Sequence, residues 1–328
     1  MILMLCALMC MVIFSACVGK YPITAGQSLE IIFRKIFGMA QTAGEMDVNV
    51  VIGLRMPRIL ASIFVGAALS VSGACYQGIF KNPLVSPDFL GVSSGACIGA
   101  AIAILLALPS MAINVFAFVG GIIVVCLTTL IPKAINNRSN IMLVLSGIIM
   151  GSLMSSILGF IKYTADPDTQ LASITYWTMG SFQYVSKDVL LIGIGVLAVP
   201  FIILILMSWW IDVLSMGEDE ARTLGANVSL VRGIAILCST LLTAGSVCIS
   251  GTIGWVGLIV PHFSRMIVGH TNKKLMPFSA IAGGMFMLLV DTLTRIVGQS
   301  EMPVSIMTGI IGAPVFCWLL FTNRRWHK

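Results

Sequence analysis

Side chains that could couple transport to an ion gradient are few in this sequence. Proton- or sodium-coupled carriers place carboxylates in the middle of the membrane, because a charge there is costly and is retained for function. Asp291 lies near the outer end of a long apolar segment, and Arg295 follows it four residues later. Side chains at that spacing share a helix face and can pair. The other acidic residues fall in predicted loops, so the sequence lacks the usual residues of ion coupling.

Metal ligands and nucleophiles are equally sparse. The nine cysteines lie in apolar runs without a CxxC pair, which favours small packing residues over disulfides or metal ligands, and the three histidines are scattered. Gly91-Val-Ser93-Ser-Gly95 matches the GxSxG nucleophile elbow. That motif needs a strand-turn-helix context, which is not predicted here. We therefore expect Gly91 and Gly95 to pack helices, and we expect no catalytic residue, no resident metal and no cofactor.

A source of energy is also missing from the chain. No GxxxxGK[ST] phosphate loop occurs, so the chain is not expected to hydrolyse ATP itself, and active transport would need a partner. A docking site for such a partner is predicted in the segment 212–228, on a short helix with an acidic start and a glycine stop. The residues concerned are Glu218, Ala221, Leu224 and Gly225. The alternative is a plain solvated loop helix.

The amino-acid composition indicates the class of fold that must position these residues. The 328 residues are 58% hydrophobic and 10% charged, and the mean hydropathy is +1.02. A soluble domain has about 25% charged residues, whereas a membrane span needs about 20 mostly apolar ones. The sequence therefore predicts an all-α, polytopic integral membrane protein, with 1–328 as a single transmembrane domain. The net charge of +6 is dispersed, so no nucleic-acid partner is expected.

Hydropathy and helix breakers predict ten spans. They lie at 2–19, 57–80, 89–108, 111–131, 140–161, 189–208, 230–250, 253–269, 275–296 and 303–322. The segment 253–269 is short and rich in glycine, so a broken or partly re-entrant helix is possible there. The run ending at Cys17 resembles a lipoprotein cleavage box but lacks a positive n-region, and we treat it as the first span. Segment 28–38 has the pattern of a helix lying on the membrane surface.

Orientation leaves an unexplained set of arginines. Ten spans put both termini on one side, and the basic tail favours the cytoplasm, although the excess of positive charge inside is weak. Arg55, Arg58 and Arg295 then fall on the outer side. Helix-end anchors that extend to the headgroups are the ordinary explanation for such arginines.

A short echo in the sequence suggests an internal repeat. Ser72-Gly73 is followed by Pro83 at the same spacing at which Ser250-Gly251 is followed by Pro261. The two copies fall on predicted spans of opposite direction, so an inverted repeat of the kind found in many transporters is expected.

Several longer motifs, in order, resemble the FecCD family of permease subunits from binding-protein-dependent ABC importers for ferric siderophores, haem and cobalamin. The motifs are Arg55 to Arg58, Ser72 to Gln77, Asn82 to Pro87, Leu90 to Ala96, Tyr176 to Gly180, Gly217 to Gly225, Gly251 to His262, Asp291 to Arg295 and Gly312 to Pro314. The similarity covers nearly the whole chain from about residue 50 onward and is weak before it.

The resemblance implies a type II ABC importer permease fold in the bacterial inner membrane. It implies two cytoplasmic ATP-binding subunits, an extracytoplasmic substrate-binding protein and a second permease copy, expected as a homodimer with the path at its interface. By resemblance, Glu218, Ala221, Leu224 and Gly225 couple to the ATPase, whereas Leu84, Asn140 and Ile141 correspond to a cytoplasmic gate. Arg55, Arg58 and Arg295 would dock the binding protein, although Asp291 could occupy Arg295.

Cargo and two other functions stay open at this point. The expected cargo is an iron-siderophore, haem or cobalamin-type metal chelate, because the chain has no ligand cluster for a bare cation. The family motifs do not say which chelate. The alternatives are an ion-coupled secondary transporter, which gradient-driven uptake without ATP would favour, and an intramembrane enzyme using Ser93.

Overall fold

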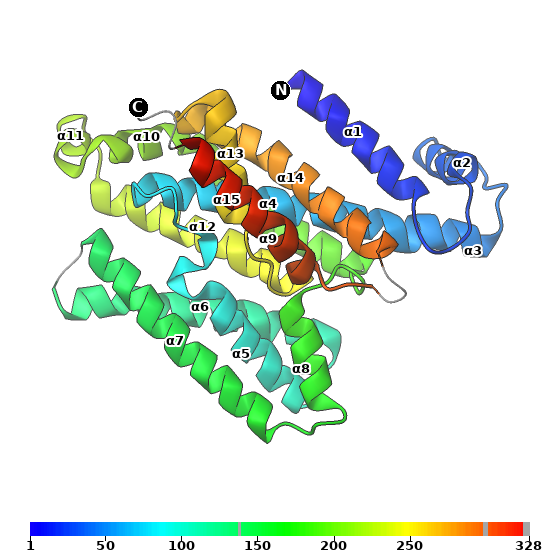
Figure 1. The fold of residues 1–328 in the computed structure, drawn as a ribbon, viewed down its shortest axis with the longest axis horizontal. Helices are drawn as coiled ribbons and strands as arrows, with labels where there is room; N and C mark the ends of the chain where they lie inside the picture. Colours follow the sequence, from blue (N-terminus) through cyan, green and yellow to red (C-terminus); the bar gives the residue numbers. More distant parts are fainter. Residues whose placement is uncertain (137–138, 298–300, 324–328) are drawn as a thin grey trace.

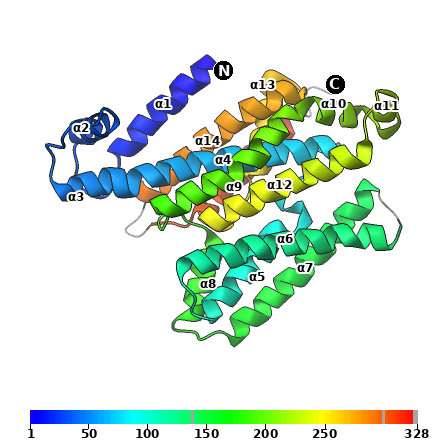
Figure 2. The same ribbon diagram turned by 180° about the vertical axis from the view of Figure 1, so that it is seen from behind.

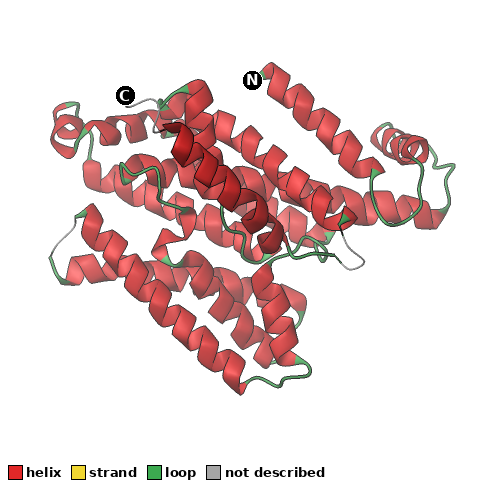
Figure 3. Ribbon diagram, viewed as in Figure 1, coloured by secondary structure: helices red, strands yellow, loops and turns green. Residues whose placement is uncertain are grey.

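The protein folds as a set of helices joined by loops, as a computed structural model shows for residues 1–136, 139–297 and 301–323 (Figure 3). Among these residues all regular secondary structure is helical. In a bilayer the helix satisfies its own backbone hydrogen bonds, which is why apolar runs of this length fold in this way. The prediction of an all-α protein is confirmed.

The elements follow one another from the first residue to Asn323. The first half comprises α1 (Ile2–Cys17), α2 (Ala25–Ile36), α3 (Glu45–Val48), the π-helical η1 (Asn49–Arg55), α4 (Met56–Ile79), the 3-10 turn η2 (Pro87–Leu90), α5 (Val92–Leu105), α6 (Ser110–Ala134) and α7 (Asn140–Thr164). The second half comprises α8 (Gln170–Met179), α9 (Lys187–Leu206), α10 (Ser208–Met216), α11 (Glu218–Thr223), α12 (Val228–Ser250), α13 (Val256–Val268), α14 (Asn272–Ile296) and α15 (Val304–Asn323).

The helices form two packed groups. In the larger group α4 is central and packs along α14, α12 and α13, with α9, α1 and α15 around them. In the smaller group α5 packs closely on α6, with α7 and α8 beside them (Figures 1 and 2). The contact of α12 with α6 joins the two groups.

Glycine lets the helices of both groups approach closely. A Cβ added to Gly73 on α4 would lie 1.8 Å from the carbonyl oxygen of Gly257 on α13. A Cβ on Gly95 of α5 would lie 2.5 Å from the Gly120 oxygen on α6. Lipid supplies no hydrophobic drive between helices, so such close backbone contact stabilises the bundle. The prediction that Gly91-x3-Gly95-x3-Gly99 serves packing is confirmed, because Gly99 also abuts the Phe116 backbone.

The ten predicted spans correspond to ten of the helices within a few residues. Six stretches of the described chain are long and apolar enough to cross a membrane. Four further apolar helices are shorter: Ile2–Cys17, Val92–Leu105, Val256–Val268 and Val304–Leu319. The count of ten stays a prediction. The predicted surface helix at 28–38 occurs as α2, which starts at Ala25 because Thr24 and Gln27 form a capping box.

Two runs of helices have a common plan. In each, a long helix (α4 or α12) leads to a shorter one (α5 or α13) whose N-cap has a positive φ, at Gly91 (80°) and Trp255 (72°). The helices α4 and α12 run in opposite directions (Figures 1 and 2). This plan agrees with an inverted repeat. The repeated Ser-Gly and Pro spacing in the sequence does not support the repeat, because Gly73 lies inside α4 whereas Gly251 ends α12.

Candidate functional site

The predicted coupling segment forms one end of the bundle. The two short helices α10 and α11 project there, next to the start of α12 (Figure 1). Glu218, in the first turn of α11, accepts a hydrogen bond from Arg232 of α12, and its second oxygen lies 3.7 Å from Arg222. The hydrogen bond from Arg232 holds the pKa of Glu218 below its ordinary value. An ion pair therefore fixes α11 against α12.

The four predicted coupling residues do not share one surface. Ala221 is fully buried and packs with Leu214 of α10 and Val231 of α12. Leu224, by contrast, is 53% exposed. Gly225 has a φ of 83°, which suits a glycine and ends the α11 turn. Ala221 thus holds α11 in place, and Leu224 is the apolar member available to a partner.

Sequence reasoning missed a second exposed apolar residue in this segment, besides Leu224. Met216, the last residue of α10, is 67% exposed. Exposed Asp219 and Glu220 lie on α11 between these two apolar residues in the chain. The signal was present in the sequence, since Met216 immediately precedes the segment whose acidic residues drew the prediction.

The predicted gate residues lie at the same end, Leu84 on the loop after α4 and Asn140 and Ile141 at the start of α7. Leu84 follows α4 and is half-exposed, with the loop held by a hydrogen bond from the Leu84 amide to Asn82 Oδ1. Asn140 begins α7, but its side chain lies outside the described part of the chain. Ile141 is 79% exposed. In the isolated chain Leu84 and Ile141 are therefore free to contact a partner or a second copy.

At the opposite end, Arg58 is engaged inside the chain. Its Nε lies 2.8 Å from Asp291 Oδ1 on α14, and its Nη1 lies 2.7 Å from Glu301 Oε2. Asp291 is fully buried, and Arg295 Nε lies 3.4 Å from its other oxygen. The predicted pairing of Asp291 with Arg295 is therefore present, together with a second arginine that the prediction did not include.

The remaining arginine contacts lie at the end of α1. Helices leave their last carbonyl groups without partners, and α1 has no basic residue in its own last turn. Arg55 donates to the carbonyl oxygens of Ala16 (2.8 Å) and Tyr21 (3.0 Å). Arg295 donates to the Ser15 carbonyl (3.3 Å) and to the Ser15 hydroxyl. Two distant arginines thus cap α1.

All three arginines predicted to meet the binding protein are buried in this chain, at 6 to 8% exposure. Their guanidinium groups already have carboxylate or carbonyl partners. Direct docking through them stays a prediction. It would require these internal contacts to be exchanged for contacts with the partner.

The exposed side of α7 carries small residues among larger apolar ones such as Ile148 and Phe160. Ser152, Ser155, Ser156 and Gly159 are exposed, and a Cβ at Gly159 would meet nothing.

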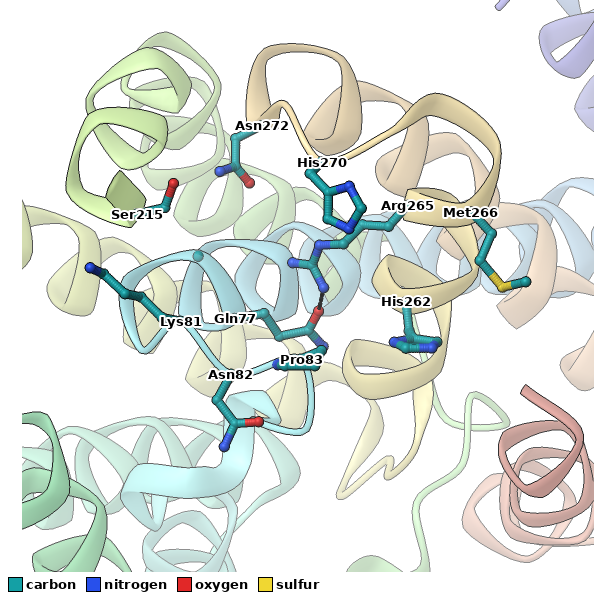
Figure 4. A pocket seen from close by; sticks show the side chains of 11 residues that line it. Gln77, Lys81, Asn82, Pro83, Ser215, His262, Arg265, Met266, His270 and Asn272 are labelled. Atoms are coloured by element: carbon teal, nitrogen blue, oxygen red, sulfur yellow. Dashed lines mark hydrogen bonds between the residues drawn. The ribbon is translucent and has the colours of Figure 1, made fainter. Parts of the chain in front are cut away.

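Two cavities open at the coupling end. One, of about 910 Å³, lies between α6, α7, α11 and α12 and is lined by Glu218 and Arg232. The other, of about 510 Å³, is lined by Gln77 of α4, Ser215 of α10 and residues of α13 (Figure 4). Gln77 and His262 belong to motifs quoted above, but the sequence alone did not bring them together.

Comparison with known proteins gives consistent matches over the whole chain. The profile of the FecCD transport family matches residues 7–322. The molybdate import system permease MolB of Haemophilus influenzae is 38% identical, covering 95% of this chain and 92% of MolB. The "Probable iron chelatin transport system permease protein" of Helicobacter pylori is 39% identical, covering 84% of this chain and 83% of its own. A solved structure described as "An inward-facing conformation of a putative metal-chelate type ABC transporter" has a TM-score of 0.86 at 34% identity, covering 97% of both chains.

Proposed function

Because this chain belongs to the FecCD transport family, we propose that it carries a metal chelate of the iron-siderophore, haem or cobalamin type across the inner membrane. The chain is a membrane-embedded permease subunit of an ABC importer and not an enzyme. ATP hydrolysis belongs to a separate subunit. The single observation that carries the cargo proposal is the end-to-end similarity to the metal-chelate type transporter.

Chelate transport suits the polar groups of the chain. Within the described residues no group of three or more His, Cys, Asp or Glu side chains could hold a metal ion. A bare cation needs such ligands. A chelated metal needs none, because the chelator already fills its coordination positions.

Molybdate is the second candidate cargo. It is favoured by the 38% identity to the molybdate permease over nearly the whole of both chains. Molybdate is a small oxyanion, so the two cargoes differ in size and in charge. The comparisons do not favour an ion-coupled carrier. The buried carboxylate of Asp291 does not favour one either, because it is paired with Arg58.

Energy coupling is proposed to occur through α11. Two ATP-binding subunits would dock on the coupling end, with Leu224 and Met216 as apolar contacts and Glu218 holding the helix in register. The buried Ala221 and the left-handed Gly225 would shape the segment rather than touch the partner.

Assembly with a second permease copy is proposed along the exposed side of α7, with Leu84 and Ile141 closing the path at the coupling end. The substrate-binding protein would dock at the opposite end, around the arginine cluster. Arg55, Arg58 and Arg295 support that docking surface from beneath, and contact it directly only if their internal partners are displaced.

The cargo proposal is tested by competition. The chain is reconstituted in proteoliposomes with its cognate ATPase and binding protein, and uptake of radiolabelled ferric siderophore is measured in the presence of excess haemin, cobalamin or molybdate. Uptake of one chelate that molybdate leaves unchanged supports the proposal. Saturable molybdate uptake, with no uptake of any chelate, would replace it by the second candidate.

A further inference from the structure

The cavity of about 510 Å³ at the coupling end collects basic side chains from separate elements. Lys81 follows α4, His262 and Arg265 lie on α13, and His270 lies in the turn before α14 (Figure 4). No aspartate or glutamate is among the described residues that line it. The volume is in the range of small-ligand sites, which are about 300–1,000 Å³.

Nearby carboxylates are already engaged elsewhere. Asp212 accepts hydrogen bonds from the backbone amide (2.7 Å) and the side-chain amide (2.8 Å) of Asn272, at the start of α14. Glu218 forms its close ion pair with Arg232, and Lys81 acts on it only as a further positive charge. The lining itself is positive because its charged members are Lys81 and Arg265, although Asp212 keeps its negative charge behind Asn272.

Two of these groups keep unused hydrogen-bonding capacity. Arg265 donates through Nη1 to Gln77 Oε1, and it forms no ion pair with a carboxylate of the described chain. A guanidinium has five N–H donors, so most of the Arg265 donors remain. His262 is 7% exposed, and neither of its ring nitrogens has a hydrogen-bond partner in the described structure. Buried polar groups without partners are rare and indicate an absent ligand or water.

We propose that this cavity binds a small tetrahedral oxyanion, of the phosphate, sulfate or molybdate class. The planar fork of Arg265 matches two oxygens of such an anion, and the His270 ring beside it can add a donor (Figure 4). Lys81 lines the other side of the cavity, with its amine directed away from Arg265, and contributes through its charge. A metal cation would meet positive groups and no carboxylate there. The cavity is larger than one oxyanion, so water fills the remainder.

The cavity lies beside the coupling segment. Its wall includes Ser215 on α10, and the coupling helix α11 begins three residues later. A bound anion would thus link the ends of α4 and α13 to the element that leads into α11.

The experiment uses the full-length chain in detergent without added phospholipid, and titrates it with sodium molybdate, sulfate and phosphate against a chloride background by calorimetry. Saturable binding is expected for the wild type. Arg265→Gln should weaken it by about tenfold or more, the loss expected for a charge-assisted hydrogen bond. Arg265→Lys should recover part of that loss.

Two further variants keep the result interpretable. Lys81 has a positive φ of 52°, so Lys81→Asn removes its charge with a residue that tolerates this backbone. It should also weaken binding, even if Arg265→Gln fails to fold. Lys273→Gln removes an exposed charge nearby that does not line the cavity, and its binding should match the wild type. Equal binding by the wild type and Lys81→Asn, or no oxyanion binding at all, would overturn the proposal.

A lipid headgroup carries the same phosphate chemistry and is distinguished in a second arm. Nanodiscs of phosphatidylcholine alone are compared with nanodiscs containing phosphatidylglycerol. A free oxyanion site predicts equal molybdate affinity in both. The contrary result is a loss of molybdate binding in the nanodiscs that contain phosphatidylglycerol, of the same size for the wild type and for Lys273→Gln. That result would assign the cavity to a lipid headgroup and overturn the free-anion site.

Discussion

Arg58 on α4 and Asp291 on α14 form a buried ion pair, with Nε 2.8 Å from Oδ1. Both residues lie in the part of the molecule that the sequence assigned to the outer surface. The pair joins the two helices that make the most extensive contact of the larger group, and Arg295 and Glu301 complete the cluster. The arginines expected to dock a binding protein form internal contacts in this chain, and direct docking through them stays a prediction.

Removing the shared carboxylate should destabilise the fold. Asp291→Ala leaves Arg58 and Arg295 buried with one carboxylate fewer, and breaking a buried pair in this way typically costs about 3–5 kcal/mol. Thermal unfolding in detergent measures the change. Arg34→Ala breaks an exposed pair with Glu30 and should cost less than about 1 kcal/mol. Equal losses in the two variants would contradict the structural role.

The caps at the end of α1 give a local prediction. Arg55→Gln removes the donors to the Ala16 and Tyr21 carbonyls, so amide hydrogen exchange in residues 15–23 should speed up by about tenfold, while α12 is unaffected. Unchanged exchange there would mean that α1 is held by packing alone.

Coupling is tested by a buried and an exposed variant. Leu224→Arg should keep the thermal stability and weaken binding of the cognate ATPase by about tenfold or more, as expected for an apolar contact at an interface centre. Ala221→Arg should lower the stability of the segment as well, since it forces a charge into the cluster with Leu214 and Val231. Co-purification and thermal unfolding report the two effects. If Leu224→Arg binds the ATPase as the wild type does, the coupling face is elsewhere.

The ion pair of Glu218 predicts a dependence on pH. Its pKa is lowered in the folded state by the hydrogen bond from Arg232, so the pair adds stability at pH above the unfolded value of about 4.3 and loses it as pH falls through the folded value. Thermal unfolding of the wild type and Glu218→Gln should therefore differ at pH 7 and converge only once the pH falls below the lowered pKa of Glu218 in the folded state. A difference that is the same at both pH values would exclude this contribution.

Close helix contact is tested with two glycines. Gly73→Ala places a Cβ against the Gly257 carbonyl, and overpacking of this kind costs about 1–3 kcal/mol. Gly159→Ala meets nothing and should be neutral or slightly stabilising in unfolding measurements. A neutral Gly73→Ala would show that α4 and α13 can separate without loss.

The membrane helices could be predicted because their cause is local. An apolar run must satisfy its own backbone hydrogen bonds in lipid, so hydropathy located the long helices within a few residues. The short helices α8 and α10 were missed because each borders a longer apolar segment.

The site residues could be predicted only by type. Spacing suggested that Glu218, Ala221 and Leu224 share one side of a helix, but α11 ends at Thr223 and the following turn redirects the chain. The burial of Arg55 and Arg295 depends on α1, α4 and α14 meeting, which a single sequence does not reveal. The one local sign of these arginine contacts was that the last turn of α1 has no basic residue of its own.

The central claim is that this chain moves its cargo only as part of an ATP-driven assembly. The most direct test is uptake of a ferric chelate into proteoliposomes that hold the chain with its ATPase, with and without ATP and the binding protein. The account predicts uptake only when both are present, and none when the ATPase carries an inactivating substitution. Uptake that follows a proton or sodium gradient without ATP would contradict it.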